Sequence, residues 1–342
     1  MPDPAISRQV DRRLRELYEH YLPVNDADVD AYYDSARGTY PPGLAGEERD
    51  RFGIALAAAD GDLYGAGDDT TPFALQSISK VFAYSLAIED HGRDHVMRHV
   101  GVEPSGDAFH SIVFDERNDR PYNPMVNAGA LVTSHLVRGA DVAEKFERIL
   151  DVVRRYAGNP SLEVDEHTFR GEVQIADRNR ATAYLMRSQR MLDGDVEAIL
   201  ALYLQQCSIM VTCRDVALMG ATLANGGVNP VTGDRVIARA RVRDVLSVMY
   251  TCGMYDFAGE WAFEVGVPAK SGVSGGILAA VPGKMGIAVL SPGLDAYGNS
   301  VRGTRVCREI SGRLGLHVFA AESEDAMLRA PEPEPPALPG TR

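Results

Sequence analysis

Ser77 and Lys80 stand three residues apart in the run Gln-Ser-Ile-Ser-Lys that ends at Lys80. Residues three apart share one face of a helix, so the hydroxyl and the amine meet if this segment is helical. A buried, neutral lysine can remove the serine proton and leave the oxygen free to attack a carbonyl carbon. The pair therefore indicates nucleophilic acyl transfer, although the same spacing also occurs on helices that do no chemistry.

A second candidate element is Lys270-Ser271-Gly272, which Val273 follows. It matches the Lys-Thr/Ser-Gly element that serine acyl-transfer enzymes place on a strand beside the nucleophile. Only four of the 35 basic residues are lysines, and two of those four occupy the two lysine positions of this pattern in the required order. The glycine beside Val273 permits close backbone approach, so peptide N–H groups there could line an oxyanion hole.

Lys80 can act as a base only if its pKa falls well below the ordinary lysine value of ~10.4. Burial disfavours the ammonium form, and so does a second cation nearby. We therefore expect burial and Lys270 together to lower the pKa of Lys80.

Enzymes that act on penicillins carry Ser-Asp-Asn or Tyr-x-Asn between these two elements, and neither tripeptide occurs between Lys80 and Lys270. That interval contains instead Asn127 in an apolar setting, and later Glu172 and Asn179. The absence of the third element disfavours β-lactam chemistry.

The chain around these residues has strands near both ends and helices between them. An apolar residue at every third or fourth position predicts a helix over 5–22, and apolar runs predict strands over 52–59, 63–65, 276–281 and 285–290. Further helices are expected over 77–90, 196–206 and 300–314, and the first of these should end at Gly92. Another helix should begin at the capping box formed by Thr212 and Asp215. This order predicts an α/β fold of the α+β type, with an antiparallel sheet built from both chain ends and flanked by helices.

The same order predicts one domain over 1–320, in which a helical lobe at about 95–250 is inserted into the sheet lobe. A cleft between two such lobes is a natural binding site. Residues 321–342 are rich in proline and acidic residues and are expected to form a disordered tail.

Composition excludes several classes of partner. With 45% hydrophobic and 24% charged residues, the 342-residue chain is expected to fold around a core. The net charge of −13 opposes binding to nucleic acid or to an anionic membrane, and no 18 consecutive residues are apolar. We expect a cytoplasmic protein with neither kind of partner.

No metal site is expected. The four cysteines lack C-x-x-C spacing and lie in apolar stretches, as reduced core thiols do. His91, His95 and His99 fall four residues apart, but Gly92 interrupts any helix that would align them.

Several longer runs resemble the serine-dependent glutaminase family, whose fold is the serine β-lactamase/DD-peptidase type. They occur in family order across roughly 38–315, and they are Gln76–Lys80, Asn123–Ala130, Cys207–Ile209, Ala221–Gly227, Cys252–Phe257 and Pro268–Val273. The resemblance implies hydrolysis of L-glutamine to L-glutamate and ammonia through a glutamyl-serine intermediate, with no cofactor. It also implies a homodimer or homotetramer.

The resemblance further implies a role for each matching residue. Ser77 is the nucleophile, Lys80 its base, and Tyr255 the group that hands a proton to the departing ammonia. Backbone N–H groups of Ser77 and Val273 form the oxyanion hole. Glu172 faces the substrate's α-ammonium, and the residues that orient the carboxylate and the rest of the head group are Tyr40, Asn127, Asn179 and Tyr203.

Two alternatives stay open at this stage. One is an acyl hydrolase of the β-lactamase or DD-peptidase type, which the missing Ser-Asp-Asn element disfavours. The other is a catalytically inactive glutamine-binding sensor, against which the intact Ser77, Lys80 and Tyr255 argue.

Overall fold

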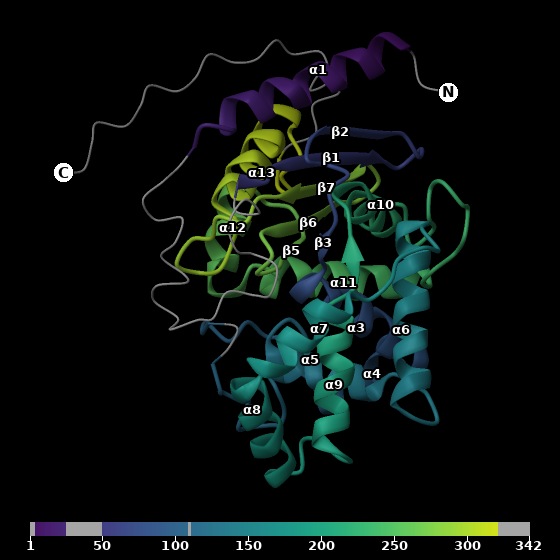
Figure 1. Cartoon of the computed structure of the whole chain (residues 1–342), viewed down its shortest axis with the longest axis vertical. Coiled ribbons are helices and arrows are strands. Elements are labelled where there is room, and N and C mark those ends of the chain that lie inside the picture. The colour runs from purple at the N-terminus through teal and green to yellow at the C-terminus, as the bar shows by residue number, and fades with distance from the viewer. Residues whose placement is uncertain (1–3, 25–49, 109–110, 321–342) are drawn as a thin grey trace, which may run out of the picture.

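A computed structural model describes residues 4–24, 50–108 and 111–320. Within these residues the main sheet has five antiparallel strands in the order β2-β1-β7-β6-β5 (Figure 1). The hairpin near the N-terminus supplies two of them and the C-terminal part supplies three, and their bounds are β1 Gly53–Ala58, β2 Leu63–Gly67, β5 Ala269–Ser271, β6 Gly276–Val281 and β7 Met285–Leu290. The predicted fold class, an antiparallel sheet assembled from both chain ends, is confirmed.

The central strands β1, β6 and β7 are buried on both faces of the sheet, and each of them contributes side chains to two separate cores. In β6, Ile277 and Ala279 belong to one apolar cluster, while Leu278 and Ala280 belong to the other. This alternation follows from the two-residue period of a strand, in which successive side chains point to opposite faces. Helices must therefore cover the sheet on both sides.

One face is covered by α1 (Pro4–Tyr21), α12 (Ala258–Glu264) and α13 (Val301–Leu314). Leu14, Trp261 and Ile310 from these helices share an apolar cluster with Ile277 and Val289 of the sheet. The predicted N-terminal and C-terminal helices are both confirmed by these bounds.

The other face is covered first by α10 (Cys213–Ala224), which begins with the predicted capping box of Thr212 and Asp215. Its approach to the sheet depends on glycine, because a Cβ atom at Gly286 of β7 would lie 2.1 Å from the Ala217 carbonyl oxygen. The backbone of α10 therefore rests directly on the central strand.

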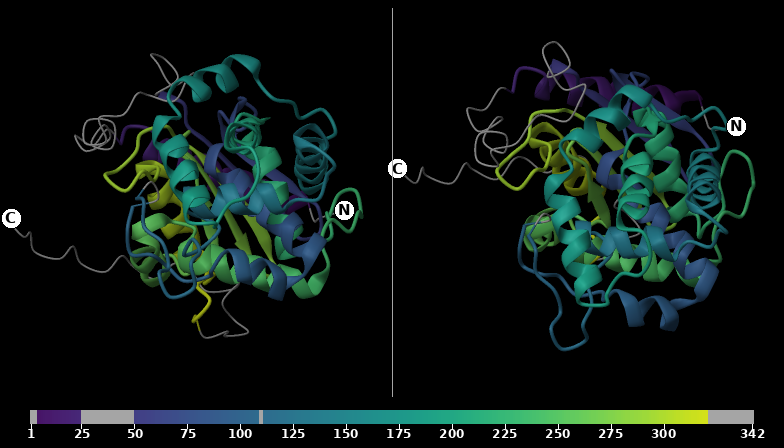
Figure 2. Two further views of the ribbon diagram at one scale, coloured as in Figure 1. Left: turned by 90° about the horizontal axis from the view of Figure 1, so that it is seen from below. Right: turned by 60° about the horizontal axis from the view of Figure 1, so that its bottom comes forward.

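The remaining helices gather below α10 and the sheet (Figure 1), and Figure 2 turns them toward the viewer. Their bounds are α3 Ser79–His91, α4 Arg93–His99, α5 Asn127–Leu136, α6 Val142–Ala157, α7 Glu166–Gln174, α8 Asp177–Ser188, α9 Val196–Cys207 and α11 Arg239–Cys252. A short pairing of β3 (Phe73–Ala74) with β4 (Met210–Val211) anchors the chain where it enters this helical region.

One predicted helix begins later than expected. The α-helix assigned to 77–90 starts at Ser79, and Ser77 lies in a preceding 3₁₀ turn, η2 (Gln76–Ile78). Gly92, with φ of +79°, ends α3 as predicted. The expectation that it keeps His91, His95 and His99 from aligning is wrong, because neighbouring rings of the three lie 4.8 Å apart between centroids. Tyr40 and the predicted tail at 321–342 lie outside the described residues.

All four cysteines are buried and free, as expected for core thiols. Among the described residues no His, Cys, Asp and Glu side chains are grouped in a way that would hold a metal ion. Over the same residues no helix is long and apolar enough to cross a bilayer.

Candidate active site

Ser77 is presented by a tight turn between β3 and α3. The chain is held by a hydrogen bond from the Leu75 N–H to the Ile209 carbonyl oxygen, 2.8 Å, and then turns sharply at Gln76, whose φ is +48°. A left-handed conformation costs a residue with a side chain on the order of 1 kcal/mol, so the surroundings must hold it. Ser77 is consequently fixed in the middle of η2, with 5% of its surface exposed.

Lys80 lies directly behind the serine. Its Nζ is 2.9 Å from Ser77 Oγ and 2.7 Å from Asn127 Oδ1, and its side chain is completely buried. Burial lowers the pKa of Lys80 to about 7, although the Cys207 thiol acts in the opposite direction. Because the amide oxygen of Asn127 can only accept, a neutral Lys80 donates to it and can turn its lone pair toward the serine hydroxyl.

Asn127, the first residue of α5, connects this pair to two further predicted site residues. Its Oδ1 accepts a hydrogen bond from the Tyr203 hydroxyl of α9, 3.2 Å, and its Nδ2 donates to Asn179 Oδ1 of α8, 2.8 Å. Burial raises the pKa of Tyr203 well above its ordinary value, so its hydroxyl remains a donor. The structure thus brings Asn127, Asn179 and Tyr203 together beside Lys80.

Tyr255 reaches the site from η3 (Tyr255–Phe257), which follows α11. A Cβ atom at Gly253 would lie 1.7 Å from the Ala269 carbonyl oxygen, so only glycine lets the end of α11 approach β5 this closely. Tyr255 itself has a φ of +59°, and its hydroxyl donates to the Ser271 carbonyl oxygen, 3.1 Å. Burial raises the pKa of Tyr255 to about 12, and a hydrogen bond with Ser77 partly offsets this, so the phenol is protonated at neutral pH.

Lys270 supports the phenol from β5. Its Nζ lies 3.9 Å from the centroid of the Tyr255 ring and donates to the same Ser271 carbonyl oxygen, 2.7 Å. Burial, and then the charge of Lys80, lowers the pKa of Lys270 well below its ordinary value. Burial lowers the pKa of Lys80 as expected, but Lys270 is not among the groups that shift it; the charge of Lys80 instead lowers the pKa of Lys270.

Glu172, on α7, is joined to the turn that carries the nucleophile. Its Oε1 accepts a hydrogen bond from Gln76 Nε2, 2.7 Å. Burial raises the pKa of Glu172, and this hydrogen bond opposes the rise. Gln76 is a site residue whose role sequence reasoning missed; its position beside the nucleophile was the available indication.

Val273 belongs to the loop after β5, which lies against the serine turn. A Cβ atom at the neighbouring Gly272 would be 3.3 Å from the Leu75 carbonyl oxygen and 3.4 Å from Gln76 Cβ. The two segments that would supply the oxyanion N–H groups are therefore in contact. Tyr40 is the one predicted site residue that lies outside the described part of the chain.

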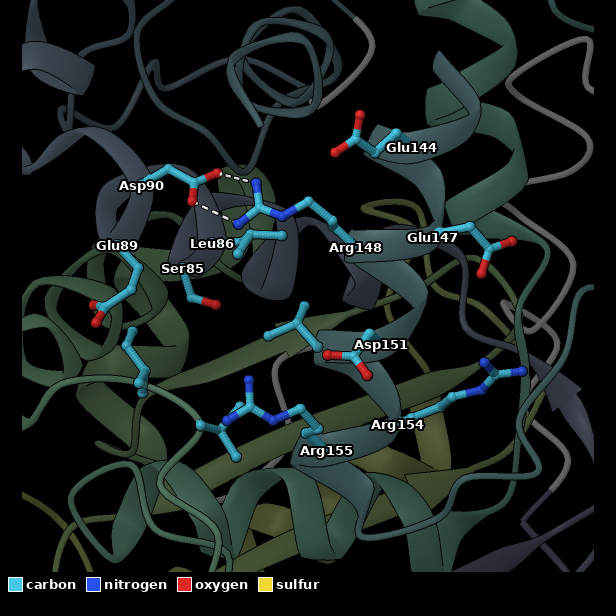
Figure 3. A pocket seen from close by; sticks show the side chains of 13 residues that line it. Ser85, Leu86, Glu89, Asp90, Glu144, Glu147, Arg148, Asp151, Arg154 and Arg155 are labelled. Atoms are coloured by element: carbon cyan, nitrogen blue, oxygen red, sulfur yellow. Dashed lines mark hydrogen bonds and ion pairs between the residues drawn. The ribbon is translucent and has the colours of Figure 1, made fainter. Parts of the chain in front are cut away.

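A separate pocket of about 480 Å³ lies between α3 and α6 (Figure 3), and none of the predicted site residues lines it. Two of its arginines are already paired: Arg148 makes two 2.7 Å hydrogen bonds to Asp90, and Arg155 Nε bonds to Asp234, 2.6 Å. The group centred on Ser77 and Lys80, and not this pocket, is the candidate active site.

Comparisons with known proteins identify the family of this chain. The family model described as Glutaminase matches residues 36–319. The glutaminase of Trichormus variabilis is 54% identical over 306 residues, which cover 90% of this chain and 89% of that protein. Glutaminase 2 of Clostridium perfringens is 47% identical over 82% of this chain and 93% of that protein. The solved structure of a probable glutaminase from Bacillus subtilis is 36% identical and superposes with a TM-score of 0.81, covering 91% of this chain and 98% of that one. With a family model and relatives of this similarity over nearly its whole length, the chain belongs to the glutaminase family.

Proposed function

We propose that this glutaminase hydrolyses L-glutamine through a glutamyl ester on Ser77. Family membership supports the overall reaction, and one observation carries the mechanism: Ser77 Oγ lies 2.9 Å from a fully buried lysine whose pKa is about 7. Such a lysine is about half neutral at pH 7 and more so at higher pH, so it can act as a general base.

In acylation, neutral Lys80 takes the Ser77 proton while Oγ attacks the side-chain amide carbon of glutamine. The N–H groups of Ser77 and Val273 hold the developing oxyanion. The C–N bond then breaks as Tyr255 gives its proton to the leaving nitrogen, and the proton held by Lys80 restores the phenol. A phenol with a pKa of about 12 suits this role, because it is present in its donor form.

In deacylation, a water molecule attacks the ester carbon and gives its proton to Lys80. The bond from Ser77 Oγ to the acyl carbon breaks, and the proton passes from Lys80 to Oγ. The net reaction consumes one water and releases L-glutamate and ammonia.

Substrate recognition is assigned to the groups around the serine. Glu172 would pair with the α-ammonium, and Tyr40, Asn127, Asn179 and Tyr203 would bind the carboxylate and the rest of the head group. The hydrogen bonds among Asn127, Asn179 and Tyr203 support this grouping.

The arrangement as a whole is proposed to be one catalytic domain over 1–320, with the helical lobe at about 95–250 and a tail at 321–342. The five-stranded sheet, built from both ends of the chain, supports one domain. A homodimer or homotetramer in the cytoplasm is proposed from the family resemblance, and light scattering of the purified protein tests the assembly.

A substrate panel tests the proposed function. Purified protein is assayed for ammonia release from L-glutamine and L-asparagine and for opening of a chromogenic β-lactam, and it is treated with a diazoketone analogue of glutamine. We expect ammonia from glutamine, an intact β-lactam and a covalent label on Ser77 in the mass spectrum. β-Lactam opening would indicate the related acyl hydrolase, and glutamine binding without ammonia would indicate a sensor.

A further inference from the structure

Gln76 occupies an unusual position directly before the nucleophile. Its backbone is in the left-handed region, with φ of +48°, although glutamine has a side chain that disfavours this conformation. The residue is 4% exposed, and its amide Nε2 donates to Glu172 Oε1, 2.7 Å. Strain of this kind at a site persists only where surrounding contacts hold it, and this hydrogen bond is one such contact.

Glu172 depends on that amide more than on any charged partner. Among the described residues Glu172 forms no ion pair; burial raises its pKa, and the hydrogen bond from Gln76 lowers it. The charge of Glu172 in turn raises the pKa of Tyr203 and of Cys207, both on α9. Its own helix also carries Glu166, His167 and Arg170.

A neutral amide is chemically suited to this position. A lysine or arginine in place of Gln76 would neutralise the carboxylate and compete with the substrate's ammonium group. An amide orients one carboxylate oxygen, favours the ionised form, and leaves the negative charge available.

We propose that Gln76 is the positioning residue that holds Glu172 ionised and at a set distance from Ser77. Gln76 and Ser77 are adjacent, so one hydrogen bond and one peptide unit connect the receptor for the α-ammonium to the nucleophile. Gln76 thereby contributes to selection for amino acids with an α-ammonium group. This inference rests on the role of Glu172 proposed above.

The main test compares two amide substrates: L-glutamine, and glutaramate, which lacks the α-amino group. Gln76→Met is nearly isosteric but removes the donor. We expect kcat/KM for glutamine to fall at least about 10-fold, mainly through KM, and kcat/KM for glutaramate to change less than about 2-fold. The glutamine defect should grow as the pH falls toward 5, because Glu172 without its donor becomes protonated more readily.

Two further variants separate positioning from folding. Gln76→Asn suits a left-handed backbone but is one methylene too short to reach Glu172, so it should share the glutamine defect while melting at or near the wild-type temperature. Gln206→Met removes another buried glutamine, which contacts Ser134 away from the site, and should leave both substrates unaffected. In Gln76→Met/Glu172→Gln, the loss should be no greater than in Glu172→Gln alone, because Gln76 acts through Glu172.

Equal losses on glutamine and glutaramate, or additive losses in the double variant, would overturn the inference. Failure of the proposed function is detected separately, because calorimetry on the Ser77→Ala background measures glutamine binding without turnover. A wild-type protein that released no ammonia would refute catalysis, while a Kd weakened at least about 10-fold by adding Gln76→Met would still support the role of Gln76. An unchanged Kd would refute that role.

Discussion

Lys80 and Lys270 lie far apart in the chain, yet both side chains are completely buried, and the charge of Lys80 lowers the pKa of Lys270. Two ammonium groups in one dry site disfavour each other's charged form. Burial and this repulsion favour the neutral amine of each lysine, whereas an arginine would stay permanently charged.

Ser77→Ala should reduce glutamine turnover by at least about 10³-fold, because loss of the nucleophile removes the whole covalent route. The matched control is Ser79→Ala, two residues along the chain, whose Oγ contacts the Cys207 sulfur at 3.9 Å and not Lys80. That variant should retain activity. Ammonia release measures the turnover of each variant, and labelling by the diazoketone shows which serine reacts. A label on Ser79 would contradict the assignment.

The pH dependence of activity should reflect Lys80. Since burial lowers its pKa to about 7, kcat/KM should rise through that pH and level off on the alkaline side. Lys80→Met should abolish the activity. Lys284→Met, at an exposed lysine in the turn between β6 and β7, should keep the wild-type profile. A fully active Lys80→Met protein would refute the mechanism.

Stability should depend on pH through the same residue. Between the ordinary lysine value of 10.5 and about 7, the unfolded chain holds a proton that the folded state lacks, so the free energy of unfolding rises with pH in this window. Falling pH across the window should cost at most roughly 5 kcal/mol and little more below it. Thermal melts from pH 10 to 6 should show a steeper loss for wild type than for Lys80→Met, and identical slopes would exclude a depressed pKa.

Glu172→Gln should raise KM for glutamine by about 10- to 100-fold with a smaller effect on kcat. The change removes the negative charge that faces the ammonium group, and a charged hydrogen bond contributes roughly 1.5–3 kcal/mol. Steady-state kinetics at pH 8 measures the two parameters. A loss confined to kcat would place Glu172 in the chemical step and contradict a binding role.

Asparagine should be a poor substrate. It is one methylene shorter than glutamine, so binding its head group would leave its amide about 1 Å or more from Ser77, and such a misplacement can cost on the order of 100-fold. Ammonia release from the two amino acids under identical conditions gives the ratio. Comparable rates would argue against a fixed distance between Glu172 and Ser77.

Deletion of 321–342 should leave glutamine turnover and the melting temperature nearly unchanged. The segment carries no candidate site residue and little apolar sequence with which to pack. Assay and thermal melt of the shortened protein test this, and a large loss of either would show that the segment packs on the body or on another subunit.

Sequence alone determined the features that depend on near neighbours. The strands over 276–281 and 285–290 and the capping box at Thr212 were predicted correctly, because short continuous apolar runs and cap chemistry act within a few residues. The pairing of Ser77 with Lys80 was also foreseeable, since three residues along a helical turn bring the two side chains together whether η2 or α3 supplies the turn. The exact start of the α-helix was not, because the pairing of β3 with β4 fixes the chain just before it.

Tertiary structure decided how the remaining groups meet. The hydrogen bond from Gln76 to Glu172 joins residues 96 apart in the chain, and no local preference specifies it. The positive φ angles of Gln76 and Tyr255 run against the preference of each residue and are held by packing around them. Burial of Lys80, and with it a pKa near 7, likewise needs α5 and α9 in place, because a lysine loses its hydration only when distant segments close around it.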